Sequence, residues 1–114
     1  GTLEDPIQRK LQQRALWAMR AVTTEGGEEF QDAFGKAEAI SVCTEAIRQH
    51  WERILELKED EATLPQDIPG VDQGISVNLV NSKDVCEAAL GTLFELTRGH
   101  ETNCRRTLQD GVDI

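Results

Sequence analysis

The chain has 114 residues, of which 21 are acidic and 12 basic, giving a net charge of −9. A chain of this length suits one domain with a modest core, because small proteins bury a limited share of their surface. The acidity argues against nonspecific nucleic-acid binding and against an anionic membrane surface, since both require basic patches. It is compatible with a basic protein or peptide partner, although an acidic surface also simply favours solubility.

The cysteines indicate a reducing environment. Cys43, Cys86 and Cys104 are odd in number and include no CxxC pair, so we expect free thiols and a cytoplasmic location. No apolar run approaches the roughly 18 residues that a membrane span needs, and no signal peptide is visible. Because the first residue is glycine rather than methionine, we expect a piece of a longer protein.

Residues 5–24 predict the first helix. Asp5 suits the N-cap and Pro6 the first helical position, where its missing N–H costs nothing. Apolar residues spaced three or four apart predict the face that contacts the core. These residues are Ile7, Leu11, Ala15, Met19 and Val22.

The glycine pair at residues 26–27 predicts the end of this helix and the start of a short one over residues 28–35. In the short helix we expect Phe30, Ala33 and Phe34 to face inward. Gly35 is expected to end or bend it.

The longest predicted helix covers residues 37–58. Its apolar positions recur at intervals of three and four, which predicts a buried stripe opposite a charged, solvated face. The stripe consists of Ile40, Cys43, Ile47, Trp51, Ile54 and Leu55.

Residues 59–82 contain prolines, glycines and acids, and they predict a long acidic loop. The alternating segment ISVNLV within it suggests a short extended piece. A further helix is predicted from Asn81-Ser82 to about Arg98, followed by a short helix over residues 101–110. The predicted buried stripe of the longer helix consists of Val85, Ala89, Leu93 and Leu96.

A pattern recurs at an interval of 74 residues. Residues 15–40 and 89–114 align without a gap, which pairs Leu16 with Leu90 and Thr23 with Thr97. Few pairs are identical; what recurs is an amphipathic helix, a glycine break, a short helix and the start of another helix. Such self-similarity is typical of α-solenoids, in which each unit buries its apolar face only against its neighbours.

The recurring segments ALWAMRAVTTEGGEEFQDAFGKAEAI and EAALGTLFELTRGHETNCRRTLQDGVDI resemble the junction between two armadillo repeats. Each looks like a third helix, the next repeat's short first helix and the start of its second helix. The resemblance implies an all-α fold, specifically a short right-handed armadillo-like solenoid segment. HEAT-type repeats and a plain helical bundle are the alternatives.

The resemblance also implies a division of the chain into repeats within a single domain over residues 1–114. Residues 5–25 would be the last helix of one repeat, residues 27–98 a central repeat, and residues 100–114 the start of a third. Armadillo repeats span roughly 40–47 residues, so the longer interval implies an acidic insertion at about residues 59–82.

Candidate binding residues follow from their repeat positions. The exposed surface of the third helices predicts a concave groove, and the insertion predicts a second binding face, because insertions in solenoids often lie where partners bind. The groove candidates are Trp17, Arg20, Thr24, Glu95 and Arg98. The insertion candidates are Asp60, Glu61, Asp67 and Asp72.

A comparison with importin-α-type proteins, which bind basic peptides through ladders of Trp and Asn, shows an incomplete ladder. Trp17 occupies the expected Trp position, but the Asn position is Ala21, and the second pair is Gly91 and Glu95. Basic-peptide binding therefore remains a lesser alternative.

No catalytic or metal-binding motif stands out. His100 and Cys104 are four residues apart, but no second pair completes a zinc site, and Cys104 aligns with a residue expected in the core. We therefore expect no metal, no cofactor and no enzyme activity. The predicted function is a protein-binding or scaffolding module, and the main alternative is a structural segment of a stable complex.

Overall fold

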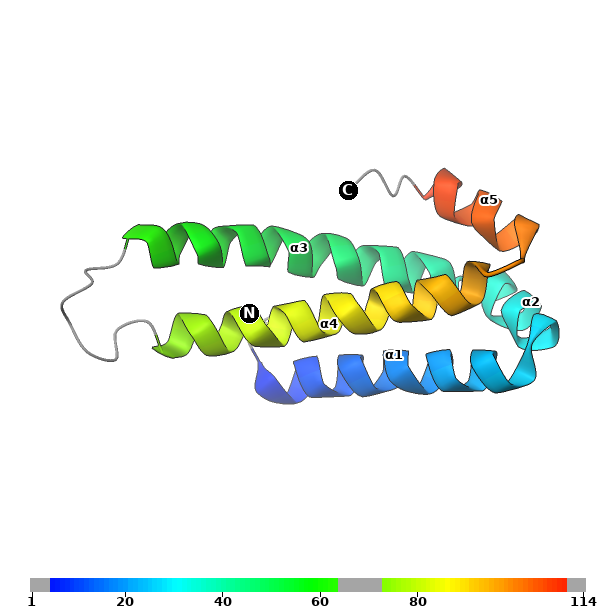
Figure 1. The fold of residues 1–114 in the computed structure, drawn as a ribbon, viewed down its shortest axis with the longest axis horizontal. Coiled ribbons are helices and arrows are strands. Elements are labelled where there is room, and N and C mark those ends of the chain that lie inside the picture. The colour runs from blue at the N-terminus through cyan, green and yellow to red at the C-terminus, as the bar shows by residue number, and fades with distance from the viewer. Residues whose placement is uncertain (1–4, 64–72, 111–114) are drawn as a thin grey trace.

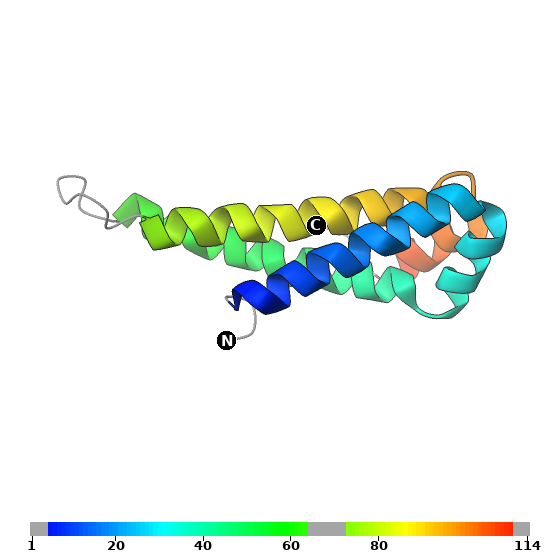
Figure 2. The same ribbon diagram turned by 90° about the horizontal axis from the view of Figure 1, so that it is seen from below.

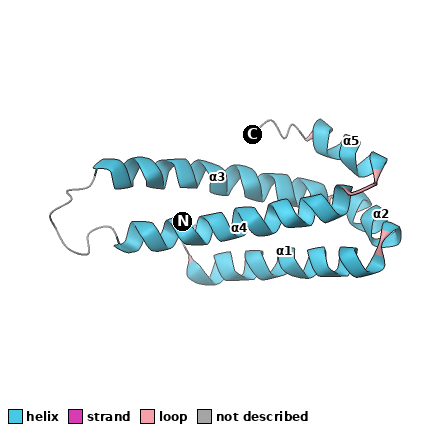
Figure 3. Cartoon of the chain, viewed as in Figure 1, coloured by secondary structure: helices cyan, strands magenta, loops and turns pink. Residues whose placement is uncertain are grey.

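The computed structural model describes residues 5–63 and 73–110, and in these ranges it contains helices and no strand (Figures 1 and 3). The all-α prediction is therefore confirmed for the described chain. The helices are α1 (Pro6–Gly26), α2 (Glu28–Lys36), α3 (Ala39–Thr63), α4 (Gln73–Thr97) and α5 (Glu101–Gln109).

The three long helices form an elongated layer with α4 in the middle (Figures 1 and 2). Helix α4 packs mainly against α3 on one side and α1 on the other. Helices α1 and α4 run in the same direction, whereas α3 runs in the opposite direction, and the short helices α2 and α5 lie at one end (Figure 1). The molecule measures 54 × 26 × 21 Å.

The predicted helix ends are confirmed where capping residues mark them. The carboxylate of Asp5 accepts a hydrogen bond of 2.9 Å from the amide of Ile7, as an N-cap does. Helix α1 ends at Gly26, and Gly27 follows with a φ of 65°. Gly99 has the same φ between α4 and α5, a conformation that favours glycine because it has no Cβ.

The core lies where α3 and α4 face each other and where α1 lies on α4. In α3 the predicted residues Ile40, Cys43, Ile47 and Ile54 are buried, and in α4 the predicted stripe is buried. The members of the α4 stripe are Val85, Ala89, Leu93 and Leu96. The periodicity therefore predicted the α4 stripe correctly and four of the six positions of the α3 stripe.

The predicted core face of α1 is wrong except at Met19, which packs against the core. Ile7 is 71 % exposed and Leu11 59 % exposed, whereas Arg9, Leu16 and Thr23 are buried. Helix α1 has two faces able to pack, and the one that contacts α4 is the more polar. The face that stays open is called here the α1 stripe: Ile7, Leu11, Ala15, Ala18 and Val22.

Several other apolar residues also lie outside the core. In α2, Gln31 and Gly35 are buried, whereas Phe30 and Ala33 are exposed and Phe34 packs at the edge of the core. Cys104 is exposed rather than buried. In α3, Trp51 and Leu55 are exposed, whereas the neighbouring His50 and Leu57 are buried.

The long acidic loop predicted over residues 59–82 is wrong at both ends. Helix α3 continues to Thr63, and α4 begins at Gln73, so ISVNLV is helical rather than extended. Of the predicted loop, residues 64–72 lie outside the described range, and they include the candidates Asp67 and Asp72. Most of the extra length therefore extends a pair of antiparallel helices beyond the end of α1 (Figure 1).

Polar side chains join the two short helices to the end of α4. The amide of Asn103 donates to the carbonyl oxygens of Gln31 (2.9 Å) and Leu96 (2.7 Å). The amide of Gln31 donates to the carbonyl oxygens of Glu95 (2.9 Å) and Arg98 (2.8 Å). Three of these acceptors, Glu95, Leu96 and Arg98, lie at the end of α4, where a helix leaves carbonyl groups without partners.

The 74-residue interval has a structural counterpart in the long helices. Thr23 donates its hydroxyl hydrogen to the carbonyl oxygen of Met19, and Thr97 makes the same bond to Leu93. The short helices are displaced by one residue from this register, since α2 begins at Glu28 and α5 at Glu101.

Candidate functional site

A groove of about 730 Å³ runs along the outer face of α4. Helix α4 forms its floor, α3 forms one wall, and one side chain of α1 forms the other. This surface is called here the α4 groove, and it is lined by Arg20, Ile47, Trp51, Ile54, Lys83, Cys86, Glu87, Leu90, Gly91 and Phe94.

Large apolar side chains are exposed in the α4 groove. Trp51 is 45 % exposed, Leu90 53 % and Phe94 58 %. Their neighbours in the groove include both signs of charge, with Lys83 and Glu87 on successive turns of α4. A contiguous apolar surface with a polar rim is typical of a protein interaction site.

Arg20 closes the groove on the side of α1. Its guanidinium lies against the backbone of Gly91, where a Cβ atom would lie only 2.7 Å from a terminal nitrogen of Arg20. The absence of a side chain at Gly91 thus leaves room for the Arg20 guanidinium, which puts a positive charge in the groove lining that also contains Phe94. This charge favours a partner with an acidic or aromatic group near that end of the groove.

The groove residues predicted from the sequence separate into two places. Trp17, Arg20 and Thr24 line a shallow hollow of about 370 Å³ on α1, together with Ala21 and Glu25. Because Arg20 also lines the α4 groove, the two depressions adjoin.

The remaining predicted groove residues, Glu95 and Arg98, lie at the end of α4 beside α2. Glu95 is buried and forms an ion pair with Arg98, with 3.5 Å between the charged atoms. Neither residue lines the two depressions described above. The side chain of Arg98 is largely exposed, so it remains accessible to a partner.

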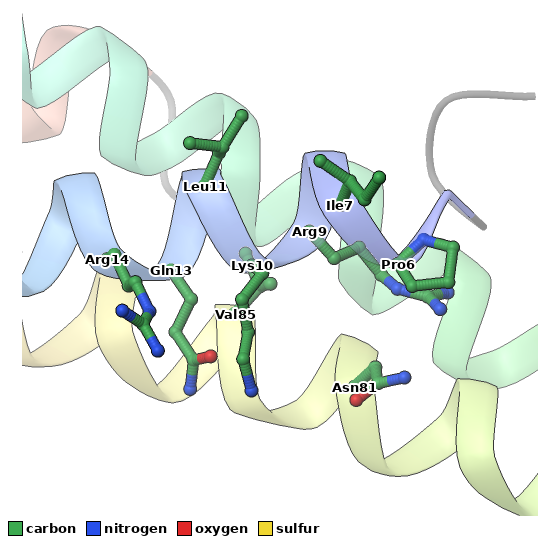
Figure 4. Close-up of a pocket in the computed structure, with 9 residues that line it drawn as sticks. All are labelled: Pro6, Ile7, Arg9, Lys10, Leu11, Gln13, Arg14, Asn81 and Val85. Carbon is green, nitrogen blue, oxygen red and sulfur yellow. The ribbon is translucent and has the colours of Figure 1, made fainter.

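A second pocket, of about 460 Å³, lies between α1 and the first half of α4 (Figure 4). Lys10, Gln13 and Arg14 extend from α1 toward α4, whereas Ile7 and Leu11, which also line the pocket, point away from α4 (Figure 4). Arg9, Lys10 and Arg14 are the charged residues of the lining, so this pocket is basic in an acidic protein.

A buried polar cluster crosses the three long helices beside this pocket. His50 is fully buried, with Nδ1 3.3 Å from the Ser82 hydroxyl and Nε2 3.0 Å from the Gln12 side-chain oxygen. The buried Arg9 donates to the side chain of Asn78 at 3.2 Å. Burial, and secondarily the charge of Arg9, lower the pKa of His50, so the ring is neutral at pH 7.

The other histidine is also engaged on both ring nitrogens. His100 Nδ1 accepts a hydrogen bond of 3.1 Å from the backbone N–H of Asn103, and Nε2 lies 2.5 Å from the carboxylate of Asp32. Because Nδ1 is an acceptor, Nε2 carries the hydrogen and donates it in a hydrogen bond to the carboxylate of Asp32. His100 is therefore the N-cap of α5 and a link to α2.

The cysteines do not form a reactive site together. Burial raises the pKa of the Cys43 thiol to about 12 and also raises that of Cys86, so both stay protonated. The exposed Cys104 donates to the carbonyl oxygen of Thr97. Within the described residues, no group of three His, Cys, Asp or Glu side chains is arranged to hold a metal ion.

The acidic candidates Asp60 and Glu61 lie on the last turn of α3 and are exposed. They belong to a charged helix end that projects past α1 rather than to an acidic loop (Figure 1). This end of α3 lies far along the molecule from the hollow that contains Thr24 (Figure 1), so the two predicted faces do not form one site.

Sequence reasoning missed Trp51, Leu90 and Phe94 as surface residues because it assigned apolar residues to the core. The signal that was available is the excess of apolar positions in α4: the core stripe accounts for Val85, Ala89, Leu93 and Leu96, and apolar residues remain on a second face. A helix with apolar residues around most of its circumference is expected to be covered on several sides.

Comparisons with known proteins add no family to these observations. In the part of the chain that the structure describes, no helix has the length and apolarity to cross a membrane. No protein-family model matches the chain, and no curated protein and no solved structure shows significant similarity to it.

Proposed function

We propose that this chain is a non-catalytic protein-binding module, and that the α4 groove is its binding surface. The observation that carries the proposal is the exposure of Trp51, Leu90 and Phe94 in one groove bounded by three helices. Exposed aromatic and aliphatic side chains cost free energy in water, and they become favourable when a partner covers them. An amphipathic helix laid along α4 fits such a groove.

An armadillo-like arrangement is the solenoid type that we favour. Support comes from the order of the helices, in which the long helix α1 and the short helix α2 recur as α4 and α5. The parallel packing of α1 and α4 provides further support, since equivalent helices of successive repeats lie side by side in a solenoid. Cysteines that are all free favour a reducing compartment such as the cytoplasm.

The hydrogen bonds of the two histidines support a non-catalytic role. His50 is enclosed in the core, and the ring nitrogens of His100 are engaged by Asn103 and Asp32. A general base needs a nitrogen within reach of substrate, and these side chains are used to hold helices together instead.

Two further candidate functions rest on other surfaces. A structural role in a stable complex is favoured by the open α1 stripe, where Ile7, Leu11 and Val22 are all more than 40 % exposed. A role as an adaptor for basic peptides is less favourable, because Arg20 lines the hollow beside Trp17 and would repel a lysine or arginine placed there.

The proposed function can be tested by selecting helical peptides from a display library on the folded protein. We expect the selected peptides to bind the wild-type chain and to lose roughly tenfold or more in affinity with Leu90→Glu or Phe94→Glu. Val42→Glu is the matched control, since Val42 is equally exposed (54 %) but lies outside the groove. Failure to select a binder, or binders that tolerate both groove substitutions, would refute the proposed function.

A further inference from the structure

We propose that copies of this chain stack head to tail, with the α1 stripe of one copy lying in the α4 groove of the next. The inference rests on the proposed function, because it names a second copy as the occupant of that groove. It is drawn from the 74-residue register. In this register the exposed face of α4 corresponds to a buried face of α1, and the exposed face of α1 corresponds to a buried face of α4.

The first relation concerns the face of α1 that packs on α4. In the 74-residue register, the buried Leu16 corresponds to Leu90, and Arg20 corresponds to Phe94. Leu16 and Arg20 contact α4 within the chain, whereas Leu90 and Phe94 line the open groove. The α4 groove is therefore the equivalent of a surface that already packs against a helix.

The second relation concerns the α1 stripe. Its residues Ile7, Leu11, Ala15, Ala18 and Val22 correspond in the same register to Asn81, Val85, Ala89, Thr92 and Leu96. The last four of these α4 residues are buried in the core or beneath α1, whereas the stripe is exposed. The stripe is thus the equivalent of the surface on α4 that receives α1.

Together the two relations predict specific contacts between copies. Within the chain, the hydroxyl of Thr92 lies 2.7 Å from the carbonyl oxygen of Leu16. The equivalent contact places Leu90 of one copy beside Ala18 of the next.

The contact of Arg20 with Gly91 predicts a second contact between copies. In the register Arg20 corresponds to Phe94 and Gly91 to Trp17, so Phe94 of one copy would lie over Trp17 of the next. Both aromatic side chains are more than half exposed in the single chain, and an aromatic pair covered in this way stabilises an interface beyond the effect of its buried area.

The side chains that meet in this arrangement are apolar. The stripe consists of aliphatic residues, and the groove exposes Trp51, Leu90 and Phe94. Arg20 and Lys83 also line the groove, so apolar contact rather than charge favours this occupant.

The two surfaces differ, so the interface is heterologous. Each copy keeps one open stripe and one open groove after it has joined a neighbour, and association therefore continues beyond a dimer. An isologous dimer, in which the same surface meets itself, does not follow from this register.

Sedimentation velocity of the whole chain and of variants closed on one side tests the proposal. The average mass of the wild type is expected to rise with concentration past that of a dimer. Leu11→Glu closes the stripe and Phe94→Glu closes the groove, so each variant alone is expected to remain a monomer. An equimolar mixture of the two is expected to stop at a heterodimer, because only one stripe and one groove remain open.

Matched controls keep this result interpretable. Val42→Glu is expected to associate like the wild type, since it lies on neither surface. Ile7→Lys and Leu90→Lys form a second pair of closed variants, and circular dichroism establishes that each variant is helical. Both positions are more than half exposed, so the substitutions do not disturb the core.

A wild type that stays monomeric at all concentrations, a closed dimer, or a mixture of closed variants that stays monomeric would overturn the stacking proposal. If peptides selected on the groove still bind it in that case, the proposed protein-binding function stands without the second copy. If no peptide binds either, both proposals fail.

Discussion

The effect of replacing Gly35 on the free energy of unfolding depends on what an added Cβ atom would contact. A Cβ added there would lie 2.1 Å from the side-chain oxygen of Asn103 and 3.0 Å from the carbon that bears it. Asn103 cannot move away, because it is fully buried and its amide donates to Gln31 and Leu96. We expect Gly35→Ala to lower the free energy of unfolding by about 1–3 kcal/mol, as overpacking does.

Gly91→Ala is the matched control for this prediction. The new methyl group would meet only the end of the Arg20 side chain, which is exposed and free to rotate away. Alanine favours a helix over glycine by about 1 kcal/mol, so this variant should be as stable as the wild type or slightly more stable. Urea denaturation of both variants provides the measurement, and equal effects would show that the neighbours of the two glycines do not matter.

His50 makes stability depend on pH. Its pKa in the folded chain lies below the ordinary value of 6.5, mainly because burial disfavours the charged ring. Below about pH 6.5 the unfolded chain therefore binds a proton at His50 that the folded chain does not bind, and stability falls as the pH falls. The contribution approaches about 1.4 kcal/mol per pH unit at most.

His50→Gln tests this dependence because it removes the titrating group and keeps a side chain able to form hydrogen bonds. Denaturation of wild type and variant should diverge in slope from pH 6.5 downward, with the variant less sensitive to acid. The variant's stability at neutral pH is a separate quantity, since the bonds to Gln12 and Ser82 change as well. Parallel pH profiles would contradict a neutral, buried His50.

At the scale of residues, sequence periodicity predicted burial well in α3 and α4 and poorly in α1. Val85 and Leu96 lie on a stripe enclosed by two helices, so the apolar pattern and the covered face coincide. In α1 the strongest apolar pattern marks the open stripe, whereas the buried residues include Arg9, which donates to Asn78 of α4, and Thr23, which donates to Met19 one turn earlier. Periodicity reports which face can be covered, not whether a neighbour is present.

Helix α4 is the element for which local composition misled the prediction. The alternation in ISVNLV and the nearby glycines suggested an extended piece, yet the segment forms the first turns of a helix of 25 residues. Packing decides here: Asn78 meets Arg9 of α1, and Ser82 meets His50 of α3. Tertiary contacts of this kind override the weak preferences of β-branched residues.

Val80→Pro tests the helical assignment of this segment. Val80 is 55 % exposed, so its replacement removes little packing, but proline in a helix interior removes a hydrogen bond and clashes with the preceding turn. We expect a loss of about 3 kcal/mol or more in the free energy of unfolding, together with lower helical circular dichroism. Val80→Ala should be neutral, and a proline variant as stable as the alanine variant would argue for an extended or irregular segment.

Helix boundaries marked by a capping residue or a glycine were easier to predict than the faces of the helices, whereas the start of α4 at Gln73 was predicted eight residues too late. Asp5 and Pro6 marked the start of α1, and glycines marked the ends of α1 and α4, because caps and positive φ angles depend on a few local atoms. The end of α3 at Thr63 was missed, since acidic residues continue the helix as well as they would a loop.

At the scale of the whole molecule, the binding surface could not be predicted from residue types alone. Trp17 and Arg20 were identified by their repeat position and do line a hollow, but the larger groove beside it depends on how α3 and α4 pair. Trp51 and Phe94 belong to different helices, far apart in sequence, and only the tertiary arrangement brings them to one groove. The repeat register predicted equivalences within the chain, and the structure adds which faces are open.

The layer of long helices has an open apolar face on α1 and another on α4. In the 74-residue register, these two faces correspond to the two surfaces that meet where α1 packs on α4. The proposed stacking follows from this correspondence, because apolar faces of this kind are favourably covered by a matching surface.

The most direct test of this account is a cross-link between one copy carrying Ala18→Cys and another carrying Leu90→Cys, with the exposed Cys104 replaced by serine in both. A short thiol-reactive cross-linker should join the two chains when they are mixed, and neither chain should form a cross-linked homodimer alone. Val42→Cys in place of Ala18→Cys should react poorly with the same partner, since Val42 is exposed on α3 and lies on neither surface. Equal cross-linking at positions 18 and 42, homodimers of either chain, or no cross-linking would contradict head-to-tail stacking.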